Sequence, residues 1–310
     1  GSSYDAAKRD FSVIRRVVIR NFRALLEVDV ELRPLTVLVG PNDSGKTSFL
    51  EAVHSKLSKR ALDREDGWRG TQQPEVQLFA SGDQAFQGSA EIFKLPSQGI
   101  PMESAGVAEE PGRGAPHLNV DGANLAAFLD YLLRRDRKRF DQVQRALRDL
   151  IPGFDEISIS TPSPDTRAIS LRIEGGFEIS GNRLSTGVRM LFFFVALAHH
   201  PSPPRVALIE EPENGVHPRR LTDIVALLRG MTSGTLSGQP VQVILSTHSP
   251  YLLDHIHLPD DQILVFNREA DGRRAARAAD EGRLRAFLDE FMLGEVWFNQ
   301  GEEGLLAPTG

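Results

Sequence analysis

The sequence predicts an α/β protein with a mostly parallel core sheet, and three observations carry this prediction. Residues 40–47 read Gly-Pro-Asn-Asp-Ser-Gly-Lys-Thr, which matches the phosphate-loop pattern G-x-x-x-x-G-K-[ST]. A short apolar run at 35–39 precedes the loop, and residues 48–53 follow it with helical spacing of apolar side chains. Two more apolar runs, 206–209 and 241–245, flank a helical pattern, as in a strand–helix–strand unit buried on both faces.

The loop at 40–47 carries a mechanism for holding a nucleotide. Gly40 and Gly45 let the backbone curl so that successive N–H groups point at one spot, and the following helix adds its positive end. Lys46 brings a full charge to the phosphate oxygens, and the Thr47 hydroxyl can ligate a bridging Mg²⁺. We therefore expect the nucleotide to contact Gly40, Pro41, Asn42, Asp43, Ser44, Gly45, Lys46, Thr47 and Ser48.

Two carboxylates end the apolar strand predicted at 206–209. A carboxylate at a strand tip beside a phosphate loop can hold the Mg²⁺ shell, and a second can orient the attacking water. The spacing assigns Glu210 to the metal and makes Glu211 the catalytic base. The alternative is a strand that ends in two solvated acids, and the neighbouring phosphate loop favours the catalytic interpretation.

Two further segments contribute candidate site residues. His248 follows the strand predicted at 241–245, where an imidazole could hydrogen-bond the γ-phosphate and act in catalysis; a lone histidine is otherwise more often structural. Ser185 and Gly187 precede the apolar stretch 190–198, which is predicted to be a buried helix. A hydroxyl and free N–H groups at a helix start form an anion site, although such a serine is usually just a helix cap.

The remaining sequence predicts the surroundings of this core. Alternating patterns at 13–20 and 26–32 indicate a small antiparallel β subdomain before the phosphate-loop strand. A strand at 263–267, the turn Asp271-Gly272 and a second strand indicate a hairpin. The predicted organisation has three parts: a tag remnant and flexible N-terminus at 1–10, an ATPase head at 11–270, and a C-terminal hairpin strand, helix and tail at 271–310. Within the head we expect a variable β and loop insertion at 60–118 and a helical subdomain at 121–150.

Composition sets limits on function. The chain has 310 residues with a net charge of −6, so bulk charge gives no support to nucleic-acid binding. It has no cysteine, which excludes disulfides and thiolate zinc sites within these residues and suits the reducing cytoplasm. The longest apolar run, 190–198, is too short to span a membrane, and we expect a cytoplasmic protein.

Taken together, the motifs resemble those of ABC-type ATPases. The order is phosphate loop, Leu-Ser-x-Gly, strand with paired acids, then strand with histidine. Residues 210–218, reading Glu-Glu-Pro-Glu-Asn-Gly-Val-His-Pro, and residues 246–250, reading Ser-Thr-His-Ser-Pro, resemble the OLD-like group, which is related to RecF and SMC heads. The opening at 19–23 also fits this group, and the resemblance covers about residues 13 to 268. It implies a P-loop NTPase fold of the ABC-ATPase type with a helical insertion.

The resemblance also implies a mechanism. Such proteins are Mg²⁺-dependent ATP hydrolases in which Leu-Ser-x-Gly of one subunit contacts ATP held by another. Ser185 and Gly187 would then act in trans within a head-to-tail homodimer or higher oligomer, with Asn214, Gly215 and His217 near the seam. The spacing leaves no room for a long coiled coil, and the sequence after 270 shows no TOPRIM metal cluster, so we expect a separate effector.

The resemblance leaves three biological roles open. Control of a nuclease or toxin in an anti-phage defence complex leads; a RecF-like role in DNA repair and a transporter's nucleotide-binding subunit are the alternatives. DNA is a possible partner at the basic run 134–139, whose other interpretation is a solvated helix face. The tail at 294–298 carries aromatic residues that would form an interface or pack on the core.

Several positions depart from the family pattern. Glu210 stands where many relatives have aspartate, and Thr186 replaces a glycine common in transporters. Arg23 could reach a phosphate or lie on the surface. The glutamine that usually senses the metal has no clear position, because the candidates lie in poorly patterned sequence: Gln72, Gln73, Gln77, Gln84 and Gln87.

Overall fold

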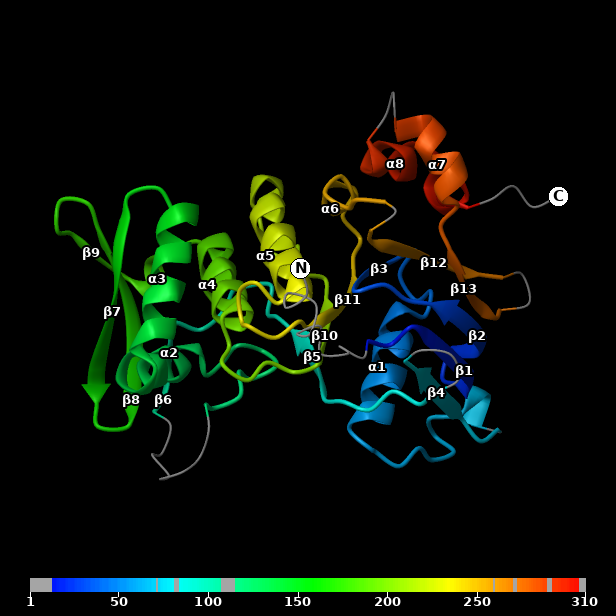
Figure 1. Cartoon of the computed structure of the whole chain (residues 1–310), viewed down its shortest axis with the longest axis horizontal. Coiled ribbons are helices and arrows are strands. Elements are labelled where there is room, and N and C mark those ends of the chain that lie inside the picture. Colours follow the sequence, from blue (N-terminus) through cyan, green and yellow to red (C-terminus); the bar gives the residue numbers. More distant parts are fainter. Residues whose placement is uncertain are drawn as a thin grey trace, which may run out of the picture.

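A nine-stranded sheet runs through the molecule in the order β4-β1-β2-β13-β12-β3-β11-β10-β5 (Figure 1). The structure is a computed structural model and describes residues 13–70, 72–80, 84–106, 115–258, 260–269, 272–288 and 292–306. The strands of this sheet are β1 (Arg16–Phe22), β2 (Leu25–Glu31), β3 (Leu35–Val39), β4 (Glu75–Phe79), β5 (Ala90–Lys94), β10 (Val206–Glu210), β11 (Gln242–Ser246), β12 (Gln262–Arg268) and β13 (Arg274–Ala278).

The sheet is parallel where the nucleotide is expected and antiparallel at its other end. Strands β12, β3, β11, β10 and β5 pair in parallel. Strands β1, β2 and β4 pair antiparallel, and β12 and β13 form the predicted hairpin. Residues 60–118, predicted as a loop-rich insertion, supply both edge strands, β4 and β5. These two strands are short, and the segment around them is rich in Gly and Pro, so the sequence pattern does not reveal them.

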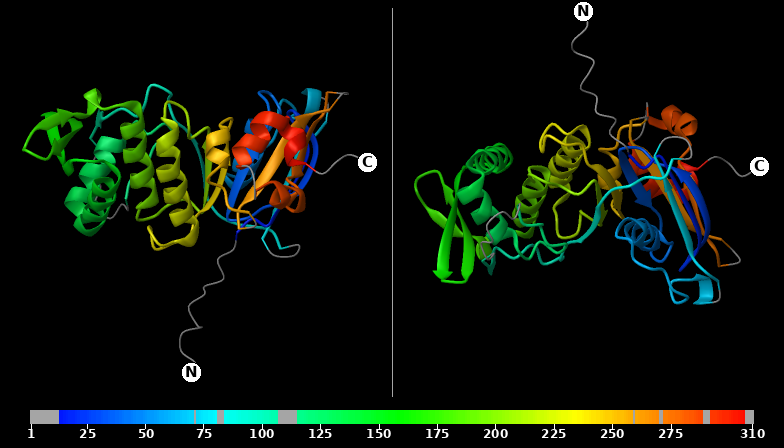
Figure 2. Two further views of the ribbon diagram at one scale, coloured as in Figure 1. Left: turned by 90° about the horizontal axis from the view of Figure 1, so that it is seen from above. Right: turned by 60° about the horizontal axis from the view of Figure 1, so that its bottom comes forward.

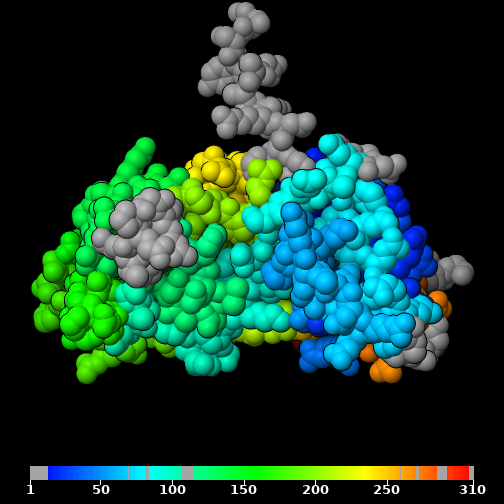
Figure 3. Space-filling view, turned by 90° about the horizontal axis from the view of Figure 1, so that it is seen from below, coloured from blue at the N-terminus to red at the C-terminus, as the bar shows by residue number. Residues whose placement is uncertain are grey.

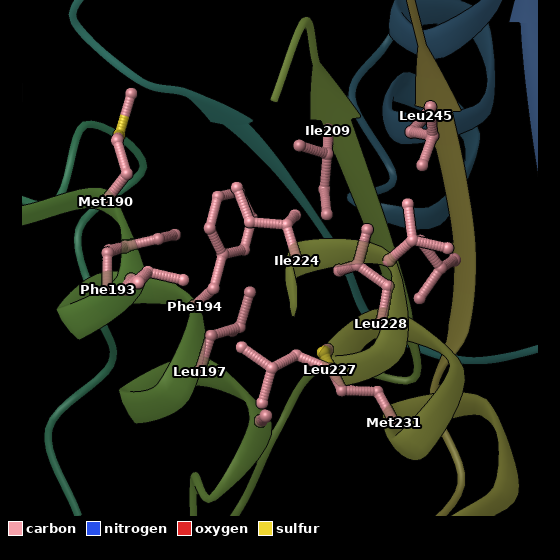
Figure 4. Packing of buried hydrophobic residues seen from close by; sticks show 14 of the residues in the cluster. Met190, Phe193, Phe194, Leu197, Ile209, Ile224, Leu227, Leu228, Met231 and Leu245 are labelled. Atoms are coloured by element: carbon pink, nitrogen blue, oxygen red, sulfur yellow. The ribbon is translucent and has the colours of Figure 1, made fainter. Parts of the chain in front are cut away.

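Two hydrophobic cores lie on opposite faces of the parallel strands, because successive side chains of a strand point to opposite sides. Helix α1 (Lys46–Leu57) packs on the face that includes Leu38 and Leu208. Helices α4 (Thr186–Ala198) and α5 (Leu221–Ser233) pack on the face that includes Val39 and Ile209. Figure 4 shows this second core, where Phe194 of α4 and Leu228 of α5 meet the side chains of the strands.

A second sheet lies at the far end of the molecule from β1 and β2 (Figures 1 and 2). It contains β6 (Glu103–Ala105), β7 (Phe154–Ser163), β8 (Thr166–Ile173) and β9 (Glu178–Ser180), with β8 between β6 and β7 and β9 also paired to β8. Figure 3 shows the molecule from below, with this end in green and the end that holds α1 in blue.

The predicted helical stretch 121–150 contains two helices rather than one. They are α2 (Leu125–Arg135) and α3 (Arg137–Leu150). Asp136 separates them because its φ of −139° is not helical, and its side chain accepts a hydrogen bond from the Arg139 N–H at 3.2 Å. An aspartate that caps the next helix breaks the chain here although the apolar spacing continues through it.

The C-terminal segment returns to the parallel sheet. Helix α6 (Pro250–Leu253) follows β11, and α7 (Glu281–Leu288) and α8 (Leu293–Leu305) follow β13. Of two adjacent aromatics in α8, Trp297 is buried, as the packing alternative predicts, whereas Phe298 is 79% exposed, as an interface residue would have to be. Across the described ranges, no helix is both long and apolar enough to cross a membrane.

Candidate nucleotide site

The carboxyl ends of four parallel strands meet at one edge of the sheet. The register pairs Leu38 of β3 with Ser246 of β11, Ser246 with Glu210 of β10, and Glu210 with Lys94 of β5. The Thr247 N–H also donates to the carbonyl of Leu38 at 3.0 Å. Ligands of open parallel sheets bind beyond the carboxyl ends of the strands, so the topology gathers predicted site residues from three separate segments at this edge.

The phosphate loop connects β3 to α1, and its glycines are required by the backbone. Gly40 has a φ of +142°, and a Cβ there would lie 2.2 Å from the carbonyl oxygen of Phe266. Gly45 has a φ of +105°, and its Cβ would lie 2.8 Å from Leu25. From β13, Arg274 Nε donates to the Asp43 carbonyl at 2.5 Å and so braces the loop. The loop is therefore held from both sides in a curled conformation.

Lys46 is buried beneath the loop. Its ammonium donates to the carbonyls of Gly40 at 2.7 Å and Pro41 at 2.9 Å. Burial lowers the pKa of Lys46 to about 8, and the nearby negative charges of Glu211, Glu302 and Glu213 oppose that shift. An anion at the loop would give the ammonium a stronger partner than these neutral carbonyls.

Glu211 is held by groups on both of its carboxylate oxygens. Asn214 Nδ2 donates to Oε2 at 2.7 Å, and His248 Nε2 lies 3.3 Å from Oε1. Glu211 has a φ of +47°, which is unfavourable for a residue with a side chain. The Glu211 N–H donates to the Ser246 carbonyl at 3.0 Å and fixes this turn. The predicted catalytic pair, Glu211 and His248, is thus brought into direct contact.

The pKa of His248 is set by its burial and by the charged groups of the same site. Burial lowers its pKa, the positive charge of Lys46 lowers it further, and Glu211 acts in the opposite direction. The imidazole is therefore mostly neutral at pH 7, with one nitrogen able to donate and the other able to accept. Its backbone N–H donates to Glu213 Oε1 at 2.7 Å, so the position of His248 is fixed from the β10 side.

Glu210 and Thr47 suit a Mg²⁺ ion bound together with phosphate. Thr47 is exposed in the first turn of α1, and Glu210 lies at the tip of β10. Within the part of the chain that the structure describes, three buried oxygens at this edge accept no hydrogen bond, namely Glu210 Oε1, Ser44 Oγ and Glu213 Oε2. Mg²⁺ usually takes one or two carboxylates and completes its shell with water and phosphate, so these residues fit the ion.

Three other predicted residues lie apart from this cluster. Ser185 caps α4, its Oγ accepting from the Val188 N–H at 3.4 Å, and Gly187 follows in the first turn. Figures 1 and 2 place α4 on the far side of α5 from the β3–α1 loop. The guanidinium of Arg23 pairs with Glu51 and lies 3.6 Å from Asp66, so its contacts are those of a structural residue.

The structure adds three residues that the sequence did not single out as site residues. Glu213 is half-buried and accepts from Thr247 Oγ1 as well as from the His248 N–H, and desolvation raises its pKa. Lys94 ends β5 beside Glu210, and Arg274 braces the phosphate loop. Glu213 lies within the quoted motif 210–218 and could have been found there. Lys94 and Arg274 could not, because strand pairing alone brings them to the site.

Two family models match the sequence. One, described as "AAA domain, putative AbiEii toxin, Type IV TA system", matches residues 74–254, and one described as "AAA ATPase domain" matches residues 13–77. The chain is 25% identical over 383 residues to the OLD nuclease of Thermus scotoductus, covering 95% of this chain and 70% of that protein. It is 22% identical over 252 residues to the "Probable ATP-dependent transporter ycf16" of Cyanidium caldarium, covering 79% and 82%.

Solved structures confirm the predicted fold. An SMC head bound to the C-terminal winged-helix domain of ScpA has a TM-score of 0.54 and 12% sequence identity to this chain. The superposition covers 88% of this chain and 99% of that one. At this identity the likeness shows the fold alone, and that fold is the predicted P-loop NTPase architecture.

Proposed function

This chain belongs to the AAA ATPase family described as "AAA domain, putative AbiEii toxin, Type IV TA system", and from that premise we propose how its site hydrolyses ATP. The chain is a P-loop enzyme of the ABC and SMC type, related to OLD nuclease. The observation that carries the proposal is the contact of Glu211 with His248 at 3.3 Å beside the buried Lys46.

In the proposed mechanism each site residue has one task. Lys46 and the amides of the loop bind the phosphates, and Thr47 with Glu210 would hold Mg²⁺, which would supply positive charge against the phosphates. Glu211 accepts a proton from the attacking water, and its orientation is set by Asn214. The neutral imidazole of His248 has a single N–H, which faces Glu211 in this structure and can be donated to the γ-phosphate instead once ATP is bound.

The variant Glu211→Gln tests this assignment. It keeps the size of the side chain and the contact to Asn214 but cannot accept the proton. We expect kcat to fall by about 10² to 10⁴-fold while the affinity for ATP changes little. Single-turnover hydrolysis and equilibrium nucleotide binding separate the two effects. The assignment fails if the variant hydrolyses bound ATP as fast as the wild type.

We further propose that two chains close head-to-tail around two ATP molecules. The support is that Ser185 is exposed and that a Cβ on Gly187 would meet no atom within 4 Å, so both positions are open to a second molecule. Loss of the γ-phosphate would remove a ligand shared by two chains and reopen the dimer. Light scattering with ATP on the Glu211→Gln background measures this directly. A monomer under all nucleotide conditions would contradict it.

We propose that the closed dimer controls a separate effector, a nuclease or toxin in an anti-phage complex. Relatedness to an OLD nuclease and an SMC head found in complex with a second protein support this proposal. Similarity to a transporter ATPase keeps a membrane partner as the alternative. Co-purification with the products of neighbouring genes distinguishes the two, because a nuclease or toxin supports the first and a permease supports the second.

DNA contact at the basic run 134–139 receives little support from the side chains there. Arg134 pairs with Asp130 at 2.9 Å, and Arg137 pairs with Asp141 at 3.1 Å. Arg139 donates to the Ser237 carbonyl at 2.8 Å. These local contacts favour the interpretation of a solvated helix face, so a RecF-like role would need a different DNA surface.

A further inference from the structure

A lysine occupies the position where the metal-binding carboxylate would meet its ion. Lys94 ends β5, directly opposite Glu210 in the parallel register of β5 and β10. Its ammonium lies 3.1 Å from Glu210 Oε1. That distance is within ion-pair range although the oxygen accepts no aligned hydrogen bond, so charge alone holds the contact.

The same ammonium has a second carboxylate within reach. Glu51 of α1 places its Oε1 3.5 Å from Lys94 Nζ, and its Oε2 is occupied by Arg23. The side chain of Lys94 is 47% exposed, whereas those of Glu210 and Glu51 are 20% and 23% exposed. The cation is therefore the more exposed partner, on a long side chain that lies between two more buried carboxylates.

We propose that Lys94 competes with the divalent ion for Glu210 and moves to Glu51 when the ion binds. This inference rests on the proposed role of Glu210 in binding the metal. A divalent ion and an ammonium cannot both lie against the same carboxylate oxygen, because their positive charges repel at that separation. Glu51 keeps the displaced ammonium paired, which lowers the cost of the exchange.

The competition makes the Mg²⁺ requirement a property of three residues. With Lys94 present, the ion must displace it before Glu210 is available. Without Lys94, Glu210 is free at once, so less Mg²⁺ is needed. Without Glu51, the carboxylate that stays paired with Lys94 among the residues the structure describes is Glu210, so more Mg²⁺ is needed. Two substitutions in one charge network thus have opposite predicted effects, which a purely structural role of either residue does not predict.

Equilibrium binding of a fluorescent ATP analogue, titrated with Mg²⁺ and without reference to turnover, tests the proposal. For Lys94→Gln, we expect the half-saturating Mg²⁺ concentration to fall about five-fold, the scale of a partly exposed ion pair. For Glu51→Gln, we expect it to rise by a similar factor. In the double variant Lys94→Gln with Glu51→Gln, the rise should vanish, because the lysine that Glu51 attracts is absent.

Two controls make the outcomes separable. Lys56→Gln removes an exposed positive charge from the same helix as Glu51 and should leave the Mg²⁺ requirement unchanged. Glu210→Gln should raise it, and if it does not, the metal role of Glu210 is wrong. If Glu210→Gln raises the requirement but Lys94→Gln leaves it unchanged or raises it, the competition is refuted while the metal role stands. A rise from Glu51→Gln that persists in the double variant refutes the transfer to Glu51.

Discussion

His200 uses both of its ring nitrogens inside the protein. Nε2 lies 3.1 Å from the Pro116 carbonyl, and the Ser202 N–H lies 3.0 Å from Nδ1. These contacts require the neutral ring with its proton on Nε2, because Nδ1 must accept. Burial lowers the pKa of His200 to about 4, and the ring stacks on Phe128 with the centroids 4.9 Å apart.

A histidine with a lowered pKa makes stability depend on acid. As the pH falls below about 6.5, the unfolded chain binds a proton at His200 that the folded chain excludes, so stability falls. Above that pH the contribution of His200 is constant. We expect His200 to account for about 2 kcal/mol of the stability lost between pH 7 and pH 5. Urea unfolding of the wild type and of His200→Gln at both pH values measures this difference.

The result for His200 needs a matched histidine for comparison. His257 is exposed, and His257→Gln should leave the acid sensitivity of the wild type intact. His200→Gln should be less stable at pH 7 but lose less stability on acidification. Equal losses in the wild type and in His200→Gln would show that the acid sensitivity arises elsewhere.

At the residue scale, sequence predicts those side chains whose position follows from their own segment. Lys46, Glu210, Glu211 and His248 each stand at the end of a recognisable strand or loop, and parallel strands end together, so their meeting is predictable. Lys94 belongs to the edge strand β5, whose partner β10 is more than a hundred residues further along the chain. No local pattern in the sequence predicts that pairing.

At the scale of elements, α8 is joined to the site through α6. The Gly294 N–H of α8 donates to Asp254 Oδ1 at 2.7 Å, just after α6 ends. A Cβ on Gly294 would lie 2.2 Å from the Pro250 carbonyl oxygen and 2.6 Å from Asp254 Oδ1. The close approach of the two helices therefore requires glycine, and α6 begins two residues after His248.

Gly294→Ala should push α8 away from α6. We expect a loss of about 1–3 kcal/mol, the usual cost of forcing extra volume into a packed contact. Thermal or urea unfolding measures the change. Gly282→Ala in α7 is the matched control, because its Cβ would meet only Asp280 Oδ1 at 3.3 Å and alanine favours helix. A Gly294→Ala protein as stable as this control would mean that the contact is not tight.

Elements also show where local patterns mislead. The apolar spacing through residues 121–150 is continuous, yet Asp136 ends one helix and caps the next. Capping depends on one side chain and its backbone angles, to which apolar periodicity is insensitive. The buried parallel strands β10 and β11 are easier to predict, because burial on both faces requires a continuous apolar run.

At the scale of the whole molecule, one chain presents two halves of different sites. The phosphate loop, Glu211 and His248 gather at the strand tips, whereas Ser185 and Gly187 lie at the start of α4 with open space around Gly187. In the proposed dimer, the first group of one chain faces the second group of its partner. Two-fold symmetry then forms two identical composite sites from two copies.

Mixing two inactive variants tests whether a site is shared between chains. Lys46→Ala damages the phosphate-loop half, and Gly187→Gln places a side chain at α4 where a Cβ meets no atom of its own chain within 4 Å. A mixed dimer has one site that carries both defects and one that carries neither. Random mixing in equal amounts should therefore restore roughly a quarter of wild-type hydrolysis, provided that one intact site suffices.

Lys46→Ala mixed with Glu211→Gln is the control. Both changes lie in the same half, so every site keeps one defect and the mixture should stay inactive. Recovery in both mixtures, or in neither, would contradict a site built from two chains.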